Sequence, residues 1–207
     1  MKIQQSLSLL ALLSINLILH LRPTTAAVSQ PRTPHTDFIR SSCGVTLYPA
    51  LCFNSLAGYA NTVQRDPAQL ARVAIGVSLS KARRMTRYLS NITRDAEFGS
   101  EPRATAALHD CFSVYGDAVD QIKRSLGQMR RLGGISGESL RFQLSNVQTW
   151  MSAALTNEDT CTDGFEDVAD GPLKKDVCAW SVKVKKITSN ALALVNSYAE
   201  KASTHQR

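Results

Sequence analysis

Two pairs of acidic residues are the best candidates in this chain for a catalytic acid and base. Asp117 and Asp120 lie three apart on a helical pattern, and Glu158 is adjacent to Asp159. General acid–base chemistry needs one carboxyl group of a pair to be buried, so that its pKa rises while its neighbour stays ionised. We expect both pairs to point away from the apolar stripes of their helices, so neither pair should have the required buried carboxyl group beside an ionised one.

The histidines and cysteines do not form a more convincing catalytic site. Beyond the N-terminal segment the histidines are His35, His109 and His205, and only His109 falls within a helical pattern. The nearby Cys111 is expected to be oxidised, so it is not a nucleophile for that imidazole. The chain carries no GxSxG motif, no phosphate-binding or dinucleotide-binding loop and no CxxC pair. We therefore expect a protein that is not an enzyme and that needs neither a cofactor nor a metal ion.

The first residues predict export from the cell. Lys2 precedes a run rich in leucine and isoleucine over residues 7–21, and small residues follow at 24–27. This order is typical of a secretory signal peptide, here residues 1–26. Polar residues interrupt the run, which is already short for a membrane span of about 20 residues. We expect a secreted, extracellular protein with no membrane attachment after cleavage.

The charge balance points to acidic surroundings. The 207 residues include 24 basic and 17 acidic side chains, for a formal net charge of +7. Residues 1–26 hold Lys2 and Arg22 and no acid, so cleavage would leave +5, from 22 basic and 17 acidic residues. The basic residues are not interleaved with stacking aromatics, which argues against a nucleic acid partner. An acidic polysaccharide or an acidic protein fits an extracellular chain better.

Five cysteines lie beyond the signal segment, and in an oxidising compartment four of them are expected to pair. Proximity favours a bridge between Cys43 and Cys52. The remaining three, Cys111, Cys161 and Cys178, compete for a second bridge. If their helices are antiparallel neighbours, Cys111 lies beside Cys161, so we favour Cys178 as the unpaired thiol, packed as a small hydrophobe.

The first part of the mature chain is predicted to contain a flexible lead-in and short helices separated by turns. Residues 27–36 are polar and contain two prolines, so we expect a flexible lead-in. Residues 37–62 hold short apolar clusters that Gly44 and Pro49 interrupt. These turn-forming residues predict a helical hairpin that a Cys43–Cys52 bridge would cross-link.

Four long amphipathic patterns follow over residues 66–203. They are expected to begin near Pro67, near Pro102, after Gly137 and near Lys174. The third should end near Asn157 and the fourth near Ala202, and no stretch alternates in the manner of a strand. The sequence therefore predicts an all-α fold, an up-and-down four-helix bundle preceded by an N-terminal helical hairpin with two disulfides.

Three cysteine-centred blocks resemble one known family. Residues 43–52, Cys-Gly-Val-Thr-Leu-Tyr-Pro-Ala-Leu-Cys, resemble the N-terminal cysteine hairpin of the plant invertase and pectin methylesterase inhibitor family. Residues 107–120, Ala-Leu-His-Asp-Cys-Phe-Ser-Val-Tyr-Gly-Asp-Ala-Val-Asp, look like its third-cysteine helix. Residues 147–161, Val-Gln-Thr-Trp-Met-Ser-Ala-Ala-Leu-Thr-Asn-Glu-Asp-Thr-Cys, look like its fourth-cysteine segment. The resemblance implies an inhibitor domain over residues 37–203 of a plant protein of the cell wall or apoplast.

The resemblance also implies bonds and contacts. The implied bridges are Cys43–Cys52 and Cys111–Cys161, with Cys178 as a free thiol. Invertase inhibitors of the family carry a Pro-Lys-Phe segment, which is missing here between Arg130 and Phe142. The resemblance is therefore closer to the pectin methylesterase inhibitors, and it implies that the target enzyme is contacted by a set of four residues, Asp117, Asp120, Thr160 and Asp163.

These four residues also admit an ordinary interpretation. Asp120 could pair with Arg124 one helical turn further on, and Thr160 and Asp163 could cap a turn. Asn91 opens the one glycosylation sequon of the chain, Asn-Ile-Thr, near the expected end of a helix.

The expected function is that of a secreted inhibitor of pectin methylesterase, forming a non-covalent complex that blocks the pectin-binding cleft. The alternative within the family is an invertase (β-fructofuranosidase) inhibitor. A third possibility is a non-inhibitory wall module, held on acidic pectin by its basic charge.

Overall fold

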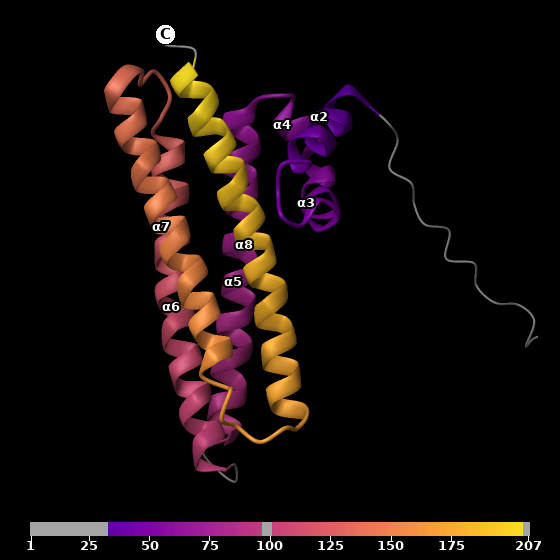
Figure 1. The fold of residues 1–207 in the computed structure, drawn as a ribbon, viewed down its shortest axis with the longest axis vertical. Helices are drawn as coiled ribbons and strands as arrows, with labels where there is room; N and C mark the ends of the chain where they lie inside the picture. Colours follow the sequence, from indigo (N-terminus) through magenta and orange to yellow (C-terminus); the bar gives the residue numbers. More distant parts are fainter. Residues whose placement is uncertain (1–32, 97–100, 205–207) are drawn as a thin grey trace, which may run out of the picture. The chain divides into compact units, whose positions relative to one another are not determined.

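A computed structural model of the chain describes residues 33–96 and 101–204. The predicted signal peptide and residues 27–32 of the predicted lead-in lie outside the described residues. Within the described ranges every regular element is helical and no strand occurs, which confirms the predicted fold class (Figure 1). No helix in these ranges is long and apolar enough to cross a membrane.

The N-terminal part is a helical hairpin. Its elements are α2 (Pro34–Cys43), α3 (Pro49–Leu56), the 3-10 turn η1 (Ala57–Tyr59) and α4 (Ala60–Val63). Helix α2 begins inside the segment that was expected to be flexible up to residue 36. It does so because Thr33 and Thr36 form a capping box: the Thr33 Oγ1 accepts from the Thr36 N–H at 3.2 Å, and the Thr36 Oγ1 accepts from the Thr33 N–H at 2.8 Å.

The four long helices form the bundle. They are α5 (Pro67–Ala96), α6 (Pro102–Arg130), α7 (Gly137–Asp163) and α8 (Pro172–Thr204). Each packs against two neighbours, in the cyclic order α5, α6, α7, α8, and Figure 1 shows them running alongside one another. Three of the four open on proline, which lacks the N–H that a first helical turn leaves unpaired. The carboxylates of Asp66 and Glu101 accept the next free N–H groups, at 2.8 to 3.2 Å.

Helix α7 is longer than predicted. It was expected to end near Asn157, and it continues to Asp163 because Glu158 and Cys161 extend its inward-facing stripe. The helix stops before Gly164, whose N–H bonds back to the Thr160 carbonyl at 3.0 Å. Helix α8 likewise begins at Pro172, slightly before the expected start at Lys174.

Two disulfides connect these elements as the cysteine spacing and the family resemblance indicated. Cys43 is bonded to Cys52 within the hairpin, and Cys111 is bonded to Cys161 between α6 and α7. All four of these cysteines are buried in the hydrophobic core. Cys178 on α8 is unpaired and half-buried. Burial raises the pKa of its thiol, with Lys174 opposing the shift, so the thiolate that reacts with oxidants is disfavoured.

A buried amide docks the hairpin onto the bundle. Asn190 of α8 donates from Nδ2 to the Tyr48 carbonyl at 3.0 Å, and its Oδ1 accepts from the Tyr48 N–H at 3.2 Å. The Lys186 ammonium lies 5.2 Å from the centroid of the Tyr48 ring. The turn between α2 and α3 is therefore held by paired bonds to a side chain far away in the sequence.

Candidate interaction surface

Helices α6 and α7 are linked at two levels. The disulfide brings the Cα atoms of Cys111 and Cys161 to 4.3 Å. Further along α6, the Asn157 Nδ2 donates to the Gln121 Oε1 at 3.1 Å. These links set the register in which residues of one helix face residues of the other.

The two predicted aspartates on α6 are exposed. Asp117 lies one helical turn before Gln121, so it occupies the side of α6 that meets α7. Asp120 is three residues from Asp117 and shares the outward face. No ion pair joins Asp120 to Arg124 in the structure, so both carboxylates remain available to a partner.

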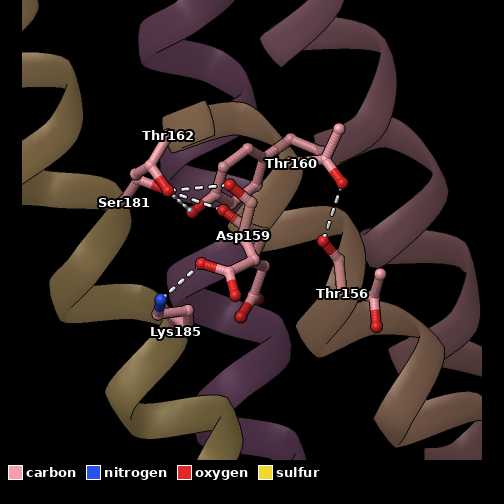
Figure 2. A network of polar contacts seen from close by, with 8 residues as sticks. Thr156, Asp159, Thr160, Thr162, Ser181 and Lys185 are labelled. Atoms are coloured by element: carbon pink, nitrogen blue, oxygen red, sulfur yellow. Dashed lines mark hydrogen bonds and ion pairs between the residues drawn. The ribbon is translucent and has the colours of Figure 1, made fainter. Parts of the chain in front are cut away.

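The two predicted residues on α7 are exposed as well. Thr160 donates from Oγ1 to the Thr156 carbonyl at 3.0 Å, a bond within the helix and not a turn cap. Figure 2 shows Thr160 and Thr156 on the opposite side of α7 from Lys185 of α8. Thr160 is three residues after Asn157, which contacts α6, so Thr160 faces outward on the α6 side. Asp163 is the last residue of the helix.

The four residues form a strip along adjacent helices and do not converge on one point. Counting from the disulfide at 1.5 Å per residue, Asp117 and Thr160 are offset by about 8 Å along the bundle axis. Asp120 and Asp163 are offset by about 16 Å in the same way. Such a strip suits a broad contact with a protein surface and has no geometry for holding a small substrate.

Glu158 was expected to point away from the core, and this is wrong. Its side chain has 0% exposure. Thr188 of α8 donates to the Glu158 Oε1 at 2.8 Å, and Ser78 of α5 lies 2.8 Å from the same threonine hydroxyl. Because the single Thr188 hydrogen goes to the carboxyl group, Ser78 is the donor in that contact.

A second branch of the same network reaches α6. Ser181 donates to the backbone carbonyl of Glu158 at 3.1 Å, and the Tyr115 hydroxyl lies 2.9 Å from the Ser181 Oγ. Tyr115 is therefore the donor in that contact, which requires a neutral phenol. Burial, and to a lesser extent the nearby Glu158, raises the pKa of Tyr115. The polar network thus draws a side chain from each of the four long helices.

Burial raises the pKa of Glu158 to about 8, against the opposing effects of the Thr188 hydrogen bond and of Lys185. The carboxyl group is therefore protonated in acidic and neutral solution. A general acid must reach a substrate, and a side chain without exposed surface does not. The raised pKa therefore reflects a structural role. The adjacent Asp159 is exposed and forms an ion pair with Lys185 (Figure 2).

Two further sequence candidates, Asn91 and His109, are also exposed. Asn91 is exposed in the last part of α5 and accepts a bond from the Arg94 Nη2 at 2.7 Å, while Thr93 of the same sequon is buried. His109 is exposed on α6. In the described part of the chain no group of three or more histidine, cysteine or acidic side chains has the placement to hold a metal ion.

Comparison with known proteins identifies the family. Residues 37–194 match the sequence model of a family described as plant invertase/pectin methylesterase inhibitor. The chain belongs to this family. The match spans the hairpin and nearly all of the bundle, including both disulfides.

Several relatives are similar over most of the chain. Pectinesterase inhibitor 3 of Arabidopsis thaliana is 42% identical over 166 residues, which are 79% of this chain and 80% of that protein. Pectinesterase inhibitor 9 of the same plant is 37% identical and covers 98% of both chains. A 21 kDa protein of Daucus carota is 43% identical over 81% of this chain and 86% of its own. Family and relatives together confirm the prediction that the chain is not an enzyme.

Solved structures agree on the fold. A crystal structure of a mutant form of a pectin methylesterase inhibitor from Arabidopsis superposes with a TM-score of 0.58 at 22% identity, covering 74% of this chain and 92% of that one. A second, of a pectin methylesterase inhibitor from Arabidopsis thaliana, gives a TM-score of 0.53 at 20% identity, covering 77% and 95%. The helical-bundle fold is therefore shared with these solved inhibitors.

Proposed function

We propose that the protein is a secreted inhibitor of pectin methylesterase that forms a non-covalent complex and covers the pectin-binding cleft of the enzyme. The observation that carries the proposal is the set of relatives named pectinesterase inhibitors, matched over about four fifths of both chains in one case and 98% of both in another. The missing Pro-Lys-Phe segment between Arg130 and Phe142 favours this target over invertase. The predicted signal peptide supports export to the compartment where a pectin methylesterase would act.

The exposed strip on α6 and α7 is the proposed contact surface. Asp117 and Asp120 present ionised carboxylates, which form stronger hydrogen bonds than neutral acceptors do. Thr160 and Asp163 add a hydroxyl and a third carboxylate on the neighbouring helix. Because the helices are joined by the disulfide, the strip is rigid before binding, and less conformational entropy is lost in the complex.

A direct titration tests the function. Mature protein added to a plant pectin methylesterase is expected to abolish methanol release from pectin once the two proteins are equimolar. A plant invertase assayed in parallel is expected to retain its sucrose hydrolysis. Full methanol release at excess protein, across acidic and neutral pH, would overturn the proposal, and loss of sucrose hydrolysis alone would assign the chain to invertase.

Charge removal tests the contact surface. Asp117→Asn and Asp120→Asn are each expected to weaken inhibition by about tenfold or more, because a charge-assisted bond contributes about 1.5–3 kcal/mol. Stability should stay within about 0.5 kcal/mol of the parent, since both side chains are exposed. Glu138→Gln, at the far end of α7, removes the same charge outside the strip and should leave the inhibition constant unchanged. An equal loss in that control would refute the assignment of the strip.

A further inference from the structure

A surface groove of about 340 Å³ lies between the hairpin and the bundle. Its polar lining consists of Tyr59 and Thr62 from the hairpin, Arg72 from α5 and Arg130 from α6. The rest of its lining comes from α5 and α6 and is apolar apart from one glycine. A volume of this size suits a ligand such as a single sugar ring.

Neither guanidinium group of the groove has an ion-pair partner in the described part of the chain. Among the ion pairs of the described residues none involves Arg72 or Arg130. The Nε atom of Arg72 is buried and has no acceptor within hydrogen-bond distance. That buried atom does not reach the groove, but the side chains of Arg72 and Arg130 line it, and two arginines without an ion-pair partner favour an anionic ligand. A carboxylate matches the planar fork of an arginine side chain.

The shape of the groove leaves room for a ring. Tyr59 is 45% exposed, so its ring and hydroxyl group are accessible at the groove wall. Gly76 of α5 forms part of the lining, and a Cβ atom added there would meet no atom within 4 Å. The groove therefore combines an aromatic surface, two positive charges and an open floor.

We propose that this groove binds the carboxylate and ring of a uronic acid residue in an anionic polysaccharide such as de-esterified pectin. Arg72 and Arg130 receive the carboxylate, and Tyr59 contacts the sugar ring. The choice of a uronic acid among anions rests on the proposed function, which places the chain in the pectin-rich wall. Such binding would retain the inhibitor on the polymer from which its target removes methyl esters.

The groove does not overlap the proposed contact surface for the enzyme. Arg130 lies ten residues beyond Asp120 on α6, which is about 15 Å along the helix. Leu126 of α6 also lines the groove, six residues or about 9 Å beyond Asp120. The other lining residues come from the hairpin and from α5, and none comes from α7. The same molecule could therefore hold the polysaccharide and the enzyme at separate places.

Calorimetric titration of the mature protein with a galacturonic acid trimer, in low salt and without any enzyme, tests the proposal. The trimer is expected to bind, and its fully methyl-esterified form is expected to bind at least about tenfold more weakly, because the ester carries no charge. Arg130→Gln is expected to weaken trimer binding by about tenfold or more. Gly76→Leu is expected to weaken it comparably by filling the groove.

The variants are chosen to stay folded and to have a matched control. Arg130 is exposed, and leucine at Gly76 raises helix propensity without meeting another atom at its Cβ. Arg87→Gln removes the same charge from an exposed position on α5 outside the groove and should change trimer binding less than about twofold. Circular dichroism melts of each variant verify the fold.

Three outcomes would overturn the proposal. The first is no heat of binding with the trimer, and the second is that the esterified trimer binds as tightly as the trimer. The third is that Arg87→Gln weakens trimer binding as much as Arg130→Gln does, which would indicate diffuse charge attraction only. Because the binding titration contains no enzyme, an absence of trimer binding would not bear on the inhibition assay, and an absence of inhibition would not bear on trimer binding.

Discussion

Raising the pH from about 5 to about 7.5 is expected to lower the free energy of unfolding by roughly 1 kcal/mol per pH unit, through Glu158 alone. The pKa of this carboxyl group is about 8 in the folded protein, against an ordinary value of 4.5. Between those values the folded state holds one more proton than the unfolded state. The stabilisation is complete below about pH 4.5 and is lost as the pH rises towards 8.

The surroundings of Glu158 explain why the proton is retained. Thr188 and Ser78 present hydroxyl groups, and Tyr115 of α6 is neutral. Lys185 of α8 lowers the pKa of the carboxyl group, but its effect is smaller than that of burial. An ionised Glu158 would therefore be a buried charge without an adequate partner, which is strongly destabilising.

Glu158→Gln isolates this effect. Glutamine keeps the shape and the acceptor for Thr188 and cannot ionise, so the variant is expected to lose the fall in stability with rising pH while remaining folded at pH 5. Urea unfolding at half-unit pH steps measures the slope. Asp159→Asn is the matched control, since it changes the adjacent but exposed carboxylate, and it should retain the slope of the parent. An unchanged slope in Glu158→Gln would show that other groups set the pH dependence.

Removing the Cys111–Cys161 bridge is expected to cost about 4 kcal/mol of stability, from the loop-closure entropy of a 50-residue separation. The Cys43–Cys52 bridge, with a separation of 9 residues, is expected to contribute about 2.5 kcal/mol. Urea unfolding at pH 5 of the two double alanine variants measures both values. Cys178→Ala, which removes a half-buried thiol and no bridge, should cost less than about 1.5 kcal/mol.

The two bridges should also differ in their effect on inhibition. Cys111–Cys161 joins the helices that carry the proposed contact strip, whereas Cys43–Cys52 lies in the hairpin. At a temperature where both double variants are folded, loss of the first bridge is expected to weaken inhibition more than loss of the second. Equal weakening would mean that the strip does not depend on the register of α6 and α7.

Local pattern was sufficient for most of the fold. The starts of α5 and α6 follow from an acidic cap residue and a proline, and the apolar stripes follow from spacings of three and four, all of which are short-range signals. The family was also visible in short blocks, because cysteines with fixed neighbours are rarely matched by chance. Those signals need no knowledge of what packs against each helix.

Glu158 shows what local pattern misses. A glutamate beside an aspartate is typical of a solvated surface, and the sequence pattern predicts an end of α7 near Asn157. In the folded chain its carboxyl group is buried because Thr188 and Ser181 of α8 supply donors to it and to its backbone. A burial that depends on partners on another helix cannot be read from the residues around it in the sequence.

The sequence by itself therefore determined the helices, the disulfide framework and the family of this protein. Only the tertiary structure decided how Asp117 and Thr160 are offset along adjacent helices, since the register is set by the bridge and the Gln121–Asn157 bond. It also decided that Tyr59, Arg72 and Arg130 share a groove. The physical reason is that periodicity, caps and cysteine spacing act within a few residues, whereas burial, register and grooves arise from contacts between helices that are distant in the chain.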